Sequence, residues 1–480
     1  MAGRSPAARL TAPVRTALPR RYTLPGVREI RLHDTLSGDV RPLEPREPGK
    51  VGIYACGPTV YARVHVGNAR PFVVFALLKR FLEHEGYDVT LVENVTDVND
   101  KIYAAAQQAG VPSEQLAREM TQAYEQDTDR LGLGRPDHEP RAVETIGPIV
   151  DLIQDLIDRG HAYAVDGDVY FDVSSFEGYG KLSNRPRDER EQGEGDDAAA
   201  LKRNPEDFAL WKARKEGEDS AWQTPWGDGR PGWHIECSAM AEQLLGTDFE
   251  IHGGGSDLVF PHHENEIAQT EAARGEPLAR IWMHNGMVRM GAEKMAKSVG
   301  NIFLLHGALD EHGRDALVMY FVGGHYRQPI AFSHDALAEA GRAVERIREL
   351  CRRLDADAPD PEGLDGFVER FFDALADDFN TPAARAVLFE WVTEANRRLD
   401  AGQPVGVGRL GEMLQTFGLE NLLGAEDEAT DPEAERLLEE RQAARAARDF
   451  DRADAIRDEL AGLGWVVRDT AEGVRLVRSS

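Results

Sequence analysis

The sequence predicts an α/β protein built on a Rossmann-type parallel sheet, and two observations lead to this prediction. An apolar run at residues 51–55 precedes an apolar helical pattern over 69–85. Gly86 ends that helix, and residues 87–93 return as a second strand, which completes a strand–helix–strand unit with a right-handed crossover. Because 480 residues exceed what one hydrophobic core holds, further domains are expected.

Composition narrows the class of protein. The 41% hydrophobic and 29% charged residues are typical of a globular chain, and no apolar run is long enough to span a membrane. Three cysteines, Cys56, Cys237 and Cys351, do not form a disulfide framework, which favours a reducing, cytoplasmic location with each thiol as a ligand or a core residue. The net charge of −28 argues against a general polyanion binder, so any nucleic acid must meet a local basic surface.

The first half of the sheet domain is expected over 28–135. It begins with a short strand over 28–34 and contains a polar helix over 113–130 near its end. Residues 1–27 precede it. Their arginines and lack of acids superficially resemble a transit peptide, but no apolar core precedes a cleavage site, and a disordered extension or an overlong start is preferred.

An inserted subdomain is expected over 136–230. It contains a helix over 145–159 and a hairpin over 161–173 whose turn is Asp166-Gly167. The charged stretch 185–197 has almost no apolar residues, so we expect an exposed mobile loop that faces solvent rather than a partner.

The remaining chain divides into the second half of the sheet domain over 231–290, a loop and connection over 291–334, an antiparallel helix bundle over 335–424, and a small α+β unit over 425–480. That last unit is expected to hold one helix and a hairpin around 469–473. Five arginines line the predicted helix: Arg441, Arg445, Arg448, Arg452 and Arg457. Two interpretations of these arginines are equally favoured: a contact with nucleic acid, or a helix face that is exposed to solvent.

A strand-to-helix turn over 54–70 is the first candidate site. The first amides of a helix lack partners and carry the positive end of its dipole, and Gly67 allows a phosphate to approach the backbone. His65 and Asn68 lie at the same turn, and Cys56 ends the preceding strand. Taken alone, such a tetrapeptide occurs by chance, and a lone cysteine is most often a core residue.

A second candidate site combines the cysteines with residues 262–266. His262 or His263 shares a helix face with Glu266, since the separations are four and three residues. With Cys56 and Cys237, either histidine completes a four-ligand set that suits zinc, and sulfur excludes magnesium and calcium. The alternative is that both cysteines are core residues and the histidines lie on an exposed turn.

A glycine-flanked loop over 291–298 carries two lysines three residues apart, Lys294 and Lys297. Lysines so placed can offset the charge that develops on a leaving pyrophosphate. A basic surface loop is nevertheless the commoner meaning of this spacing.

Taken together, these motifs resemble those of the cysteine-tRNA ligases, a family of class I aminoacyl-tRNA synthetases. His65-Val-Gly-Asn68 is similar to the family's His-Ile-Gly-His signature, and Lys294-Met-Ala-Lys-Ser298 to Lys-Met-Ser-Lys-Ser, each with mild substitutions. Four further blocks match, and the resemblance covers residues 28–478: Cys56-Gly-Pro-Thr-Val-Tyr, Asn94-Val-Thr-Asp-Val-Asn-Asp-Lys, Gly232-Trp-His-Ile-Glu-Cys237 and the stretch from His252 to Glu266.

The resemblance implies specific functions for these residues. It implies one Zn²⁺ per chain, bound by Cys56, Cys237, His262 and Glu266. Catalytic groups would be His65, Asn68, Lys294 and Lys297, and the ATP site would comprise His65, Gly67, Lys297 and Ser298. The amino-acid pocket would include Gly57, Thr59, Trp233, His234 and Asp257.

The implied reaction has two steps. The carboxylate of L-cysteine attacks the α-phosphorus of ATP with Mg²⁺, which gives a cysteinyl adenylate and pyrophosphate, and the terminal ribose hydroxyl of tRNA(Cys) then takes the cysteinyl group and releases AMP. Zinc would take a substrate thiolate and reject serine, so no editing domain is needed. Residues 425–480 would contact the anticodon, 291–334 would include a stem-contact region, and a monomer is expected. Two rivals are a cysteine:amino-sugar ligase, which lacks such a C-terminal unit, and a noncatalytic zinc-bearing tRNA-binding paralogue, which should have lost His65 or the lysines.

Overall fold

The structure is a computed structural model that describes residues 28–186, 200–290, 293–295, 302–360, 363–424, 432–446, 449–463, 465–470 and 473–478. The predicted extension over 1–27 and most of the predicted loop over 185–197 lie outside these residues. Among the described helices, none is both long and apolar enough to cross a lipid bilayer.

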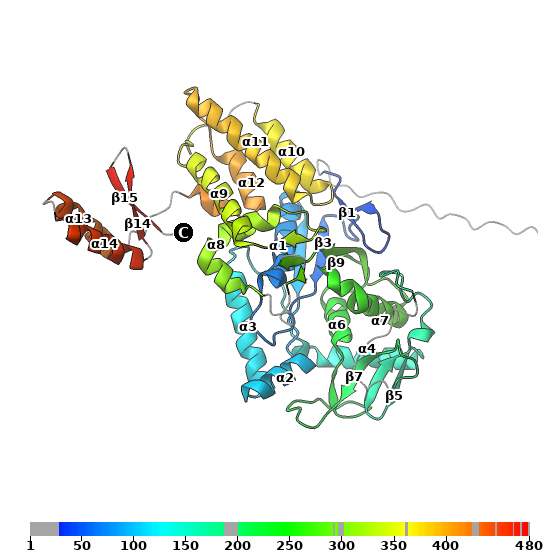
Figure 1. Cartoon of the computed structure of the whole chain (residues 1–480). Helices are drawn as coiled ribbons and strands as arrows, with labels where there is room; N and C mark the ends of the chain where they lie inside the picture. Colours follow the sequence, from blue (N-terminus) through cyan, green and yellow to red (C-terminus); the bar gives the residue numbers. More distant parts are fainter. Residues whose placement is uncertain are drawn as a thin grey trace, which may run out of the picture.

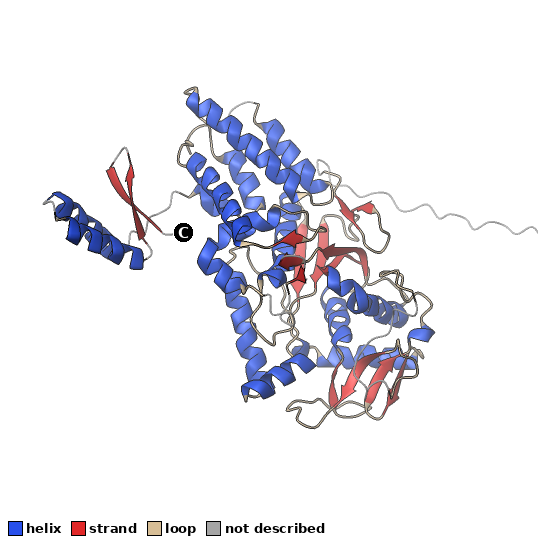
Figure 2. Cartoon of the chain, viewed as in Figure 1, coloured by secondary structure: helices blue, strands red, loops and turns tan. Residues whose placement is uncertain are grey.

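The central sheet has four parallel strands in the order β10-β9-β3-β4 (Figures 1 and 2). The strands are β3 (Lys50–Ala55), β4 (Asp88–Glu93), β9 (Phe249–Gly255) and β10 (Ala279–Asn285). The predicted unit is β3, α1 (Val66–His84) and β4, and its two strands pair in parallel. The parallel α/β fold class is therefore confirmed.

Helices cover both faces of this sheet. Successive side chains of a strand point to opposite faces, so neighbouring residues of β3 belong to different cores. Ile53 belongs to the core that contains α1, whereas Tyr54 belongs to the core that contains α6 (Trp233–Leu245). Helix α1 begins three residues before the predicted start, since the Asn68 side chain accepts a hydrogen bond from the His65 amide at 3.3 Å and closes the first turn.

The insertion between β4 and β9 holds a four-stranded antiparallel sheet in the order β5-β6-β7-β8. These strands are β5 (Ala162–Val165), β6 (Asp168–Phe171), β7 (Phe208–Ala213) and β8 (Gly229–Pro231). The predicted hairpin turns at Asp166-Gly167, where both residues have positive φ. Helices α3 (Ser113–Asp129) and α4 (Ile146–Asp158) match their predictions.

One helix of this region, α2 (Asp100–Ala109), was not predicted. Its end signals are nevertheless present in the sequence. The Asn99 side chain accepts a hydrogen bond from the Lys101 amide at 3.1 Å, and Gly110 ends the helix in the left-handed conformation with φ of 69°.

Beyond the central sheet, the chain forms a small sheet and a helical domain. The small sheet is β11 (Val288–Met290), β12 (Glu293–Lys294) and β13 (Ile330–Ala331). The helices are α8 (Leu305–Val322), α9 (His334–Cys351), α10 (Asp365–Ala376), α11 (Thr381–Asp400) and α12 (Gly408–Thr416). A separate hairpin, β1 (Arg31–His33) and β2 (Val40–Pro42), lies near the N-terminal end of the described chain.

The C-terminal unit corrects one prediction. The arginine-rich segment forms two helices, α13 (Pro432–Ala446) and α14 (Phe450–Gly462), rather than one. The second helix starts after Asp449, whose carboxylate caps it by accepting a hydrogen bond from the Arg452 amide at 3.1 Å. Strands β14 (Trp465–Thr470) and β15 (Gly473–Arg478) form the predicted hairpin with longer strands.

Candidate functional site

The candidate metal site lies at the carboxyl edge of β3, where parallel sheets commonly place ligands. Cys56 directly follows β3. His262 and His263 lie in the irregular turn Val259–His263, and Glu266 lies in the first turn of α7 (Glu264–Arg274). Residues more than 200 positions apart in the chain are therefore brought together by the strand order.

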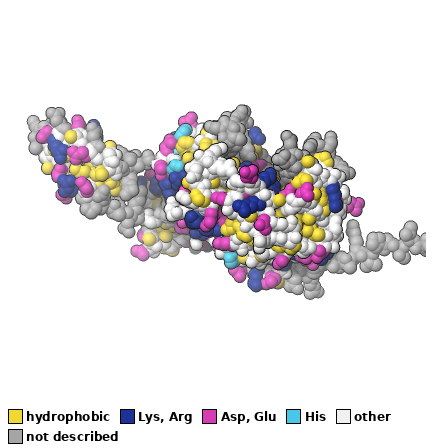
Figure 3. All heavy atoms as spheres, turned by 90° about the horizontal axis from the view of Figure 1, so that it is seen from below, with side chains coloured by type: hydrophobic (Ala, Val, Ile, Leu, Met, Phe, Trp, Pro, Cys, Tyr) yellow, Lys and Arg dark blue, Asp and Glu magenta, His cyan; other side chains and the backbone are white. Residues whose placement is uncertain are grey.

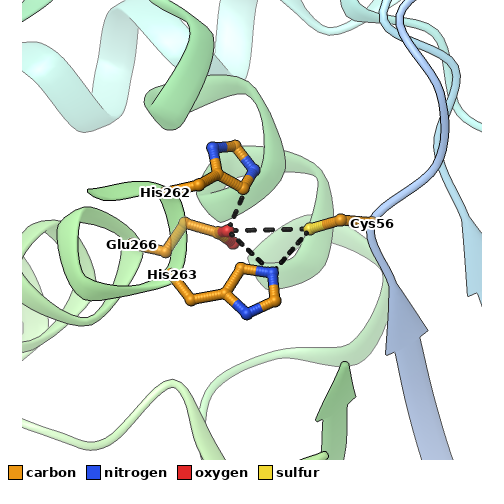
Figure 4. Close-up of side chains that lie close together, drawn as sticks. All are labelled: Cys56, His262, His263 and Glu266. Carbon is orange, nitrogen blue, oxygen red and sulfur yellow. Dashed lines mark hydrogen bonds and ion pairs between the residues drawn. The ribbon is translucent and has the colours of Figure 1, made fainter. Parts of the chain in front are cut away.

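Four donor atoms converge at this point (Figure 4). The Cys56 sulfur lies 3.6 Å from a Glu266 carboxylate oxygen and 3.3 Å from Nε2 of His263. Nε2 of His262 lies 3.2 Å from the same carboxylate oxygen. All four donors lie within 4.8 Å of one another, and one metal ion can be shared by atoms at such separations.

The charge balance of the site suits a cation. The Glu266 side chain is fully buried, and its charged-group contacts among the described residues are imidazoles rather than lysine or arginine. A buried carboxylate is costly unless a positive charge compensates it. The donor set of thiol, imidazole and carboxylate therefore fits zinc, which accepts all three ligand types.

Cys237, on α6, is buried beside these four donors. Its pKa falls to about 6, first because the Cys56 thiol hydrogen-bonds its thiolate and further because His262 lies nearby. Its sulfur also lies 3.6 Å from the side-chain oxygen of Asn94. A thiolate is the form that binds metal, so Cys237 has the chemistry of a fifth candidate donor.

Other histidines hold both candidate imidazole ligands in place. Nδ1 of His262 lies 2.9 Å from Nδ1 of His234, and Nδ1 of His263 lies 2.8 Å from Nε2 of His284. Burial lowers the pKa of His234 and of His263 well below the ordinary value, so both rings are neutral. Each candidate ligand thus has one nitrogen engaged and turns Nε2 toward the center.

The residues predicted for the amino-acid pocket lie around the same center. Trp233 and His234 open α6, and the Trp233 ring stacks on His262 with centroids 4.2 Å apart. Asp257 lies in the short turn after β9. Burial lowers the pKa of His262, but the nearby Glu266, Cys237 and, to a smaller extent, Asp257 raise it above its ordinary value.

Gly57 and Thr59 lie on the loop that follows β3, against the loop that follows β4. The Gly57 amide donates to the Asn94 side chain at 3.0 Å, and Thr59 pairs with Thr96. A Cβ atom at Gly57 would lie 1.8 Å from the Asn94 carbonyl oxygen. This close approach of two backbone segments requires glycine.

The predicted phosphate-binding turn lies at the start of α1. His65 directly precedes the helix, and Gly67 and Asn68 belong to its first turn. The Val66 amide donates to the Phe303 carbonyl at 2.9 Å. Since Phe303 follows the lysine loop in sequence, the chain returns from that loop close to the start of α1.

The lysine loop itself is only partly described. Lys297 and Ser298 lie outside the described residues, and of Lys294 only the backbone is described. Lys294 pairs with Arg289 between β12 and β11. The next residue, Met295, is buried and donates to the Val288 carbonyl at 3.0 Å.

Sequence reasoning missed two histidines of the site. His252 on β9 places Nε2 3.3 Å from Glu266, and His284 on β10 supports His263 and lies 2.8 Å from the Thr35 hydroxyl. His252 opens a block that the resemblance matched, but no function was predicted for it. An apolar run over 281–283 directly before His284 was the available signal for a buried strand.

Comparison with protein-family models gives three matches. Residues 42–342 match the model described as tRNA synthetases class I (C) catalytic domain. Residues 370–424 match a DALR domain, and residues 427–475 match a cysteinyl-tRNA ligase anticodon binding domain.

Curated relatives are similar over nearly the whole chain. The cysteine-tRNA ligase of Halorhodospira halophila is 47% identical over 461 residues, which cover 94% of this chain and 100% of the relative. That of Geobacter metallireducens is 45% identical over 480 residues, with 92% and 98% coverage. A solved Mycobacterium tuberculosis methionyl-tRNA synthetase with methionyl-adenylate aligns with a TM-score of 0.58 at 17% identity, covering 78% of this chain and 88% of that one, which shows a shared fold.

Proposed function

This chain belongs to the cysteine-tRNA ligase family of class I aminoacyl-tRNA synthetases and joins cysteine to tRNA, and we propose that it selects cysteine through a buried zinc ion. The proposed ligands are Cys56, Cys237, His262 and Glu266. The observation that carries the proposal is the buried Glu266 carboxylate among thiols and imidazoles, with no lysine or arginine partner among the described residues.

The choice of ligands rests on sulfur chemistry. Cys237 is preferred to His263 as the fourth ligand because zinc readily accepts a sulfur ligand and Cys237 is buried beside Cys56 and His262. His263 then donates a hydrogen bond from Nε2 to the Cys56 sulfur at 3.3 Å and supports the thiolate from outside the ligand set. Zinc, when bound here, supplies a position that accepts a substrate thiol as thiolate and that a serine hydroxyl fills poorly.

The residues around the metal site would orient the amino acid. Trp233 and Asp257 lie beside His262, and we assign them to the amino-acid pocket with His234. The loop containing Gly57 and Thr59 would form another wall of the pocket. Together they would position the cysteine carboxylate to attack the α-phosphorus of ATP, with pyrophosphate as the leaving group.

The nucleotide would bind at the start of α1. His65, Gly67 and Asn68 would hold phosphates at the positive end of the α1 dipole. Lys294, Lys297 and Ser298 would reach the same phosphates with Mg²⁺, because Phe303 anchors their loop to Val66. The terminal ribose hydroxyl of the tRNA would then take the acyl group from the adenylate.

A hollow between α9 and α11 is the best described candidate surface for the tRNA. It has a volume of about 510 Å³, and Arg342, Arg346 and Arg385 line it. No carboxylate of the described residues forms an ion pair with these three arginines, although Glu339 lies in the same hollow. The guanidinium groups of Arg346 and Arg385 lie 4.8 and 5.6 Å from the Phe389 ring.

Unpaired arginines stand out in a chain with a net charge of −28. On the face seen in Figure 3, basic side chains are interspersed with acidic ones. By contrast, Arg452 and Arg457 of the C-terminal helices are paired with carboxylates of the same unit. We therefore assign phosphate contacts of tRNA to the hollow, and contacts of the anticodon to the C-terminal unit on the basis of its family match.

The zinc proposal is tested with Cys237→Ser, and Cys351→Ser is the matched control. Cys351 lies half-buried on α9, outside the candidate site. Zinc content is measured by mass spectrometry, and activation by cysteine-dependent exchange of pyrophosphate into ATP. We expect Cys237→Ser to lose zinc and at least about 100-fold in kcat/KM for cysteine, while the control keeps both. Normal zinc and normal activation in Cys237→Ser would overturn the proposal.

A further inference from the structure

A second group of metal-binding side chains lies on the surface between α8 and α9, outside the site described above. Glu311 and His312 belong to α8, and His334 is the first residue of α9. Nδ1 of His334 lies 2.9 Å from a Glu311 carboxylate oxygen. Nε2 of His312 lies 3.3 Å from that oxygen and 3.3 Å from Nδ1 of His334.

These three separations match those of ligands on one metal ion. Two atoms that bind zinc tetrahedrally at about 2.0–2.1 Å are themselves about 3.3 Å apart. A triangle with the observed sides therefore has a point about 2.1 Å from all three corners, about 1 Å out of its plane. An ion at that point would replace the contact between the two ring nitrogens, which would turn toward the ion.

The backbone conformation fixes the positions of the three donors. Helix α8 is kinked at Gly313, which has φ of 74° and directly follows His312, so the helix changes direction where the donors lie. The Ser333 side chain caps α9 by accepting from the Ala336 amide at 3.1 Å and fixes the position of His334.

One of the three donors is held in place by packing, and the other two are accessible to solvent. The His312 side chain is 13% exposed, whereas those of Glu311 and His334 are 50% and 58% exposed. The His334 ring also meets the Phe303 ring edge-on with centroids 5.2 Å apart. One ligand is therefore held by packing, and the open side admits a hydrated ion.

We propose that Glu311, His312 and His334 form a second metal site, selective for divalent transition metals of the zinc type. Two imidazoles and one carboxylate favour Zn²⁺, Co²⁺ or Ni²⁺ over Mg²⁺ or Ca²⁺, which prefer all-oxygen ligands. Three protein ligands leave at least one position for water. The ligand set contains no sulfur, which distinguishes it from the buried site.

A metal ion here would fasten the start of α9 to α8. Phe303 contacts His334 on one side, and its carbonyl accepts a hydrogen bond from the Val66 amide at the start of α1 on the other. The ion would thus restrain the segment that returns from the lysine loop to the start of α1. This surface site acts on the position of a loop and does not contact the reacting groups.

The test is a titration of the full chain, as purified, with Co²⁺, in which bound cobalt is measured by equilibrium dialysis and mass spectrometry. Cobalt bound by thiolate has an intense charge-transfer band in the near ultraviolet, which imidazole and carboxylate ligands do not produce. We expect about one equivalent of cobalt without that band. Cobalt that exchanges into the buried site would show the band, so the two sites are counted separately.

The matched variants are His312→Ala with His334→Ala, and His138→Ala as an exposed imidazole elsewhere. The double variant should lose the equivalent without the band, and Glu311→Gln should weaken it about tenfold. The His138→Ala control should keep it. Unchanged cobalt binding in the double variant, or equal loss in the control, would overturn the proposal. Unchanged pyrophosphate exchange would show that the double variant is folded.

Discussion

The carboxyl group of Glu93 provides the sharpest quantitative prediction. Glu93 ends β4 and is 5% exposed, and burial raises the pKa of its carboxyl group to about 7. The Tyr124 hydroxyl donates to one carboxylate oxygen at 2.5 Å, while the other oxygen is buried without a hydrogen-bond partner. The ordinary pKa of the group is 4.5, so the folded chain retains this proton over a pH range in which the unfolded chain has lost it.

The direction of the effect follows from this difference. Because the folded pKa is raised, the stabilisation is complete below pH 4.5 and is lost as the pH rises through about 7. Each pKa unit corresponds to about 1.4 kcal/mol, so ionisation of Glu93 costs the folded state about 3 kcal/mol above pH 7. Replacing Glu93 with glutamine removes this cost, because an amide stays neutral and can still accept from Tyr124.

The assay compares thermal unfolding of the native chain and Glu93→Gln between pH 5 and 8.5. The variant should gain stability relative to the native chain as the pH rises, by roughly 5–10 °C in the transition that contains the central sheet. Glu114→Gln, at a carboxyl group that is 86% exposed, serves as the control and should leave the pH profile unchanged. Parallel profiles for the native chain and Glu93→Gln would refute the reasoning.

Three further outcomes are expected. Gly57→Ala should lower stability by about 3 kcal/mol, measured by thermal unfolding, and reduce cysteine activation, because its Cβ would lie 1.8 Å from the Asn94 carbonyl oxygen; normal values for both would contradict the close approach. Arg346→Gln should raise KM for tRNA about tenfold and reduce its salt dependence without changing pyrophosphate exchange, while Arg352→Gln, an exposed residue at the end of the same helix, should do neither. Removing the metal with a chelator should lower the unfolding temperature and cysteine activation together, and added Zn²⁺ should restore both; activity that survives complete removal would argue against a zinc-dependent pocket.

Local patterns were sufficient to predict much of the fold. The apolar run of β3 and the apolar helical pattern of α1, ended by Gly86, indicated the first strand–helix–strand unit. The turn at Asp166-Gly167 indicated the hairpin of the insertion. These features depend on backbone preferences and on burial of neighbouring side chains, which a short window of sequence contains.

Where the predictions failed, local signals were weak or competed with one another. The arginine-rich C-terminal segment has helical residues throughout, so the break at Asp449 was missed even though aspartate often caps a helix. Helix α2 was missed because its start lies in a polar stretch that resembled a loop, and the capping residues Asn99 and Gly110 were not given weight.

The candidate site required the tertiary structure. The sequence supplied the ligand types and left His262 and His263 as alternatives, because both lie within one turn of Glu266. Only the fold places both Nε2 atoms beside Glu266 and adds His252 and His284 from neighbouring strands.

Sequence alone thus determined which chemical groups the chain carries and which elements hold them, since both are local properties. The tertiary structure decided which of these groups meet, because contact across 200 residues depends on the order of parallel strands and on the packing of α6 and α7 against them. The same reason explains the surface group of Glu311, His312 and His334, whose three donors meet only because α8 bends at Gly313 and packs against the start of α9.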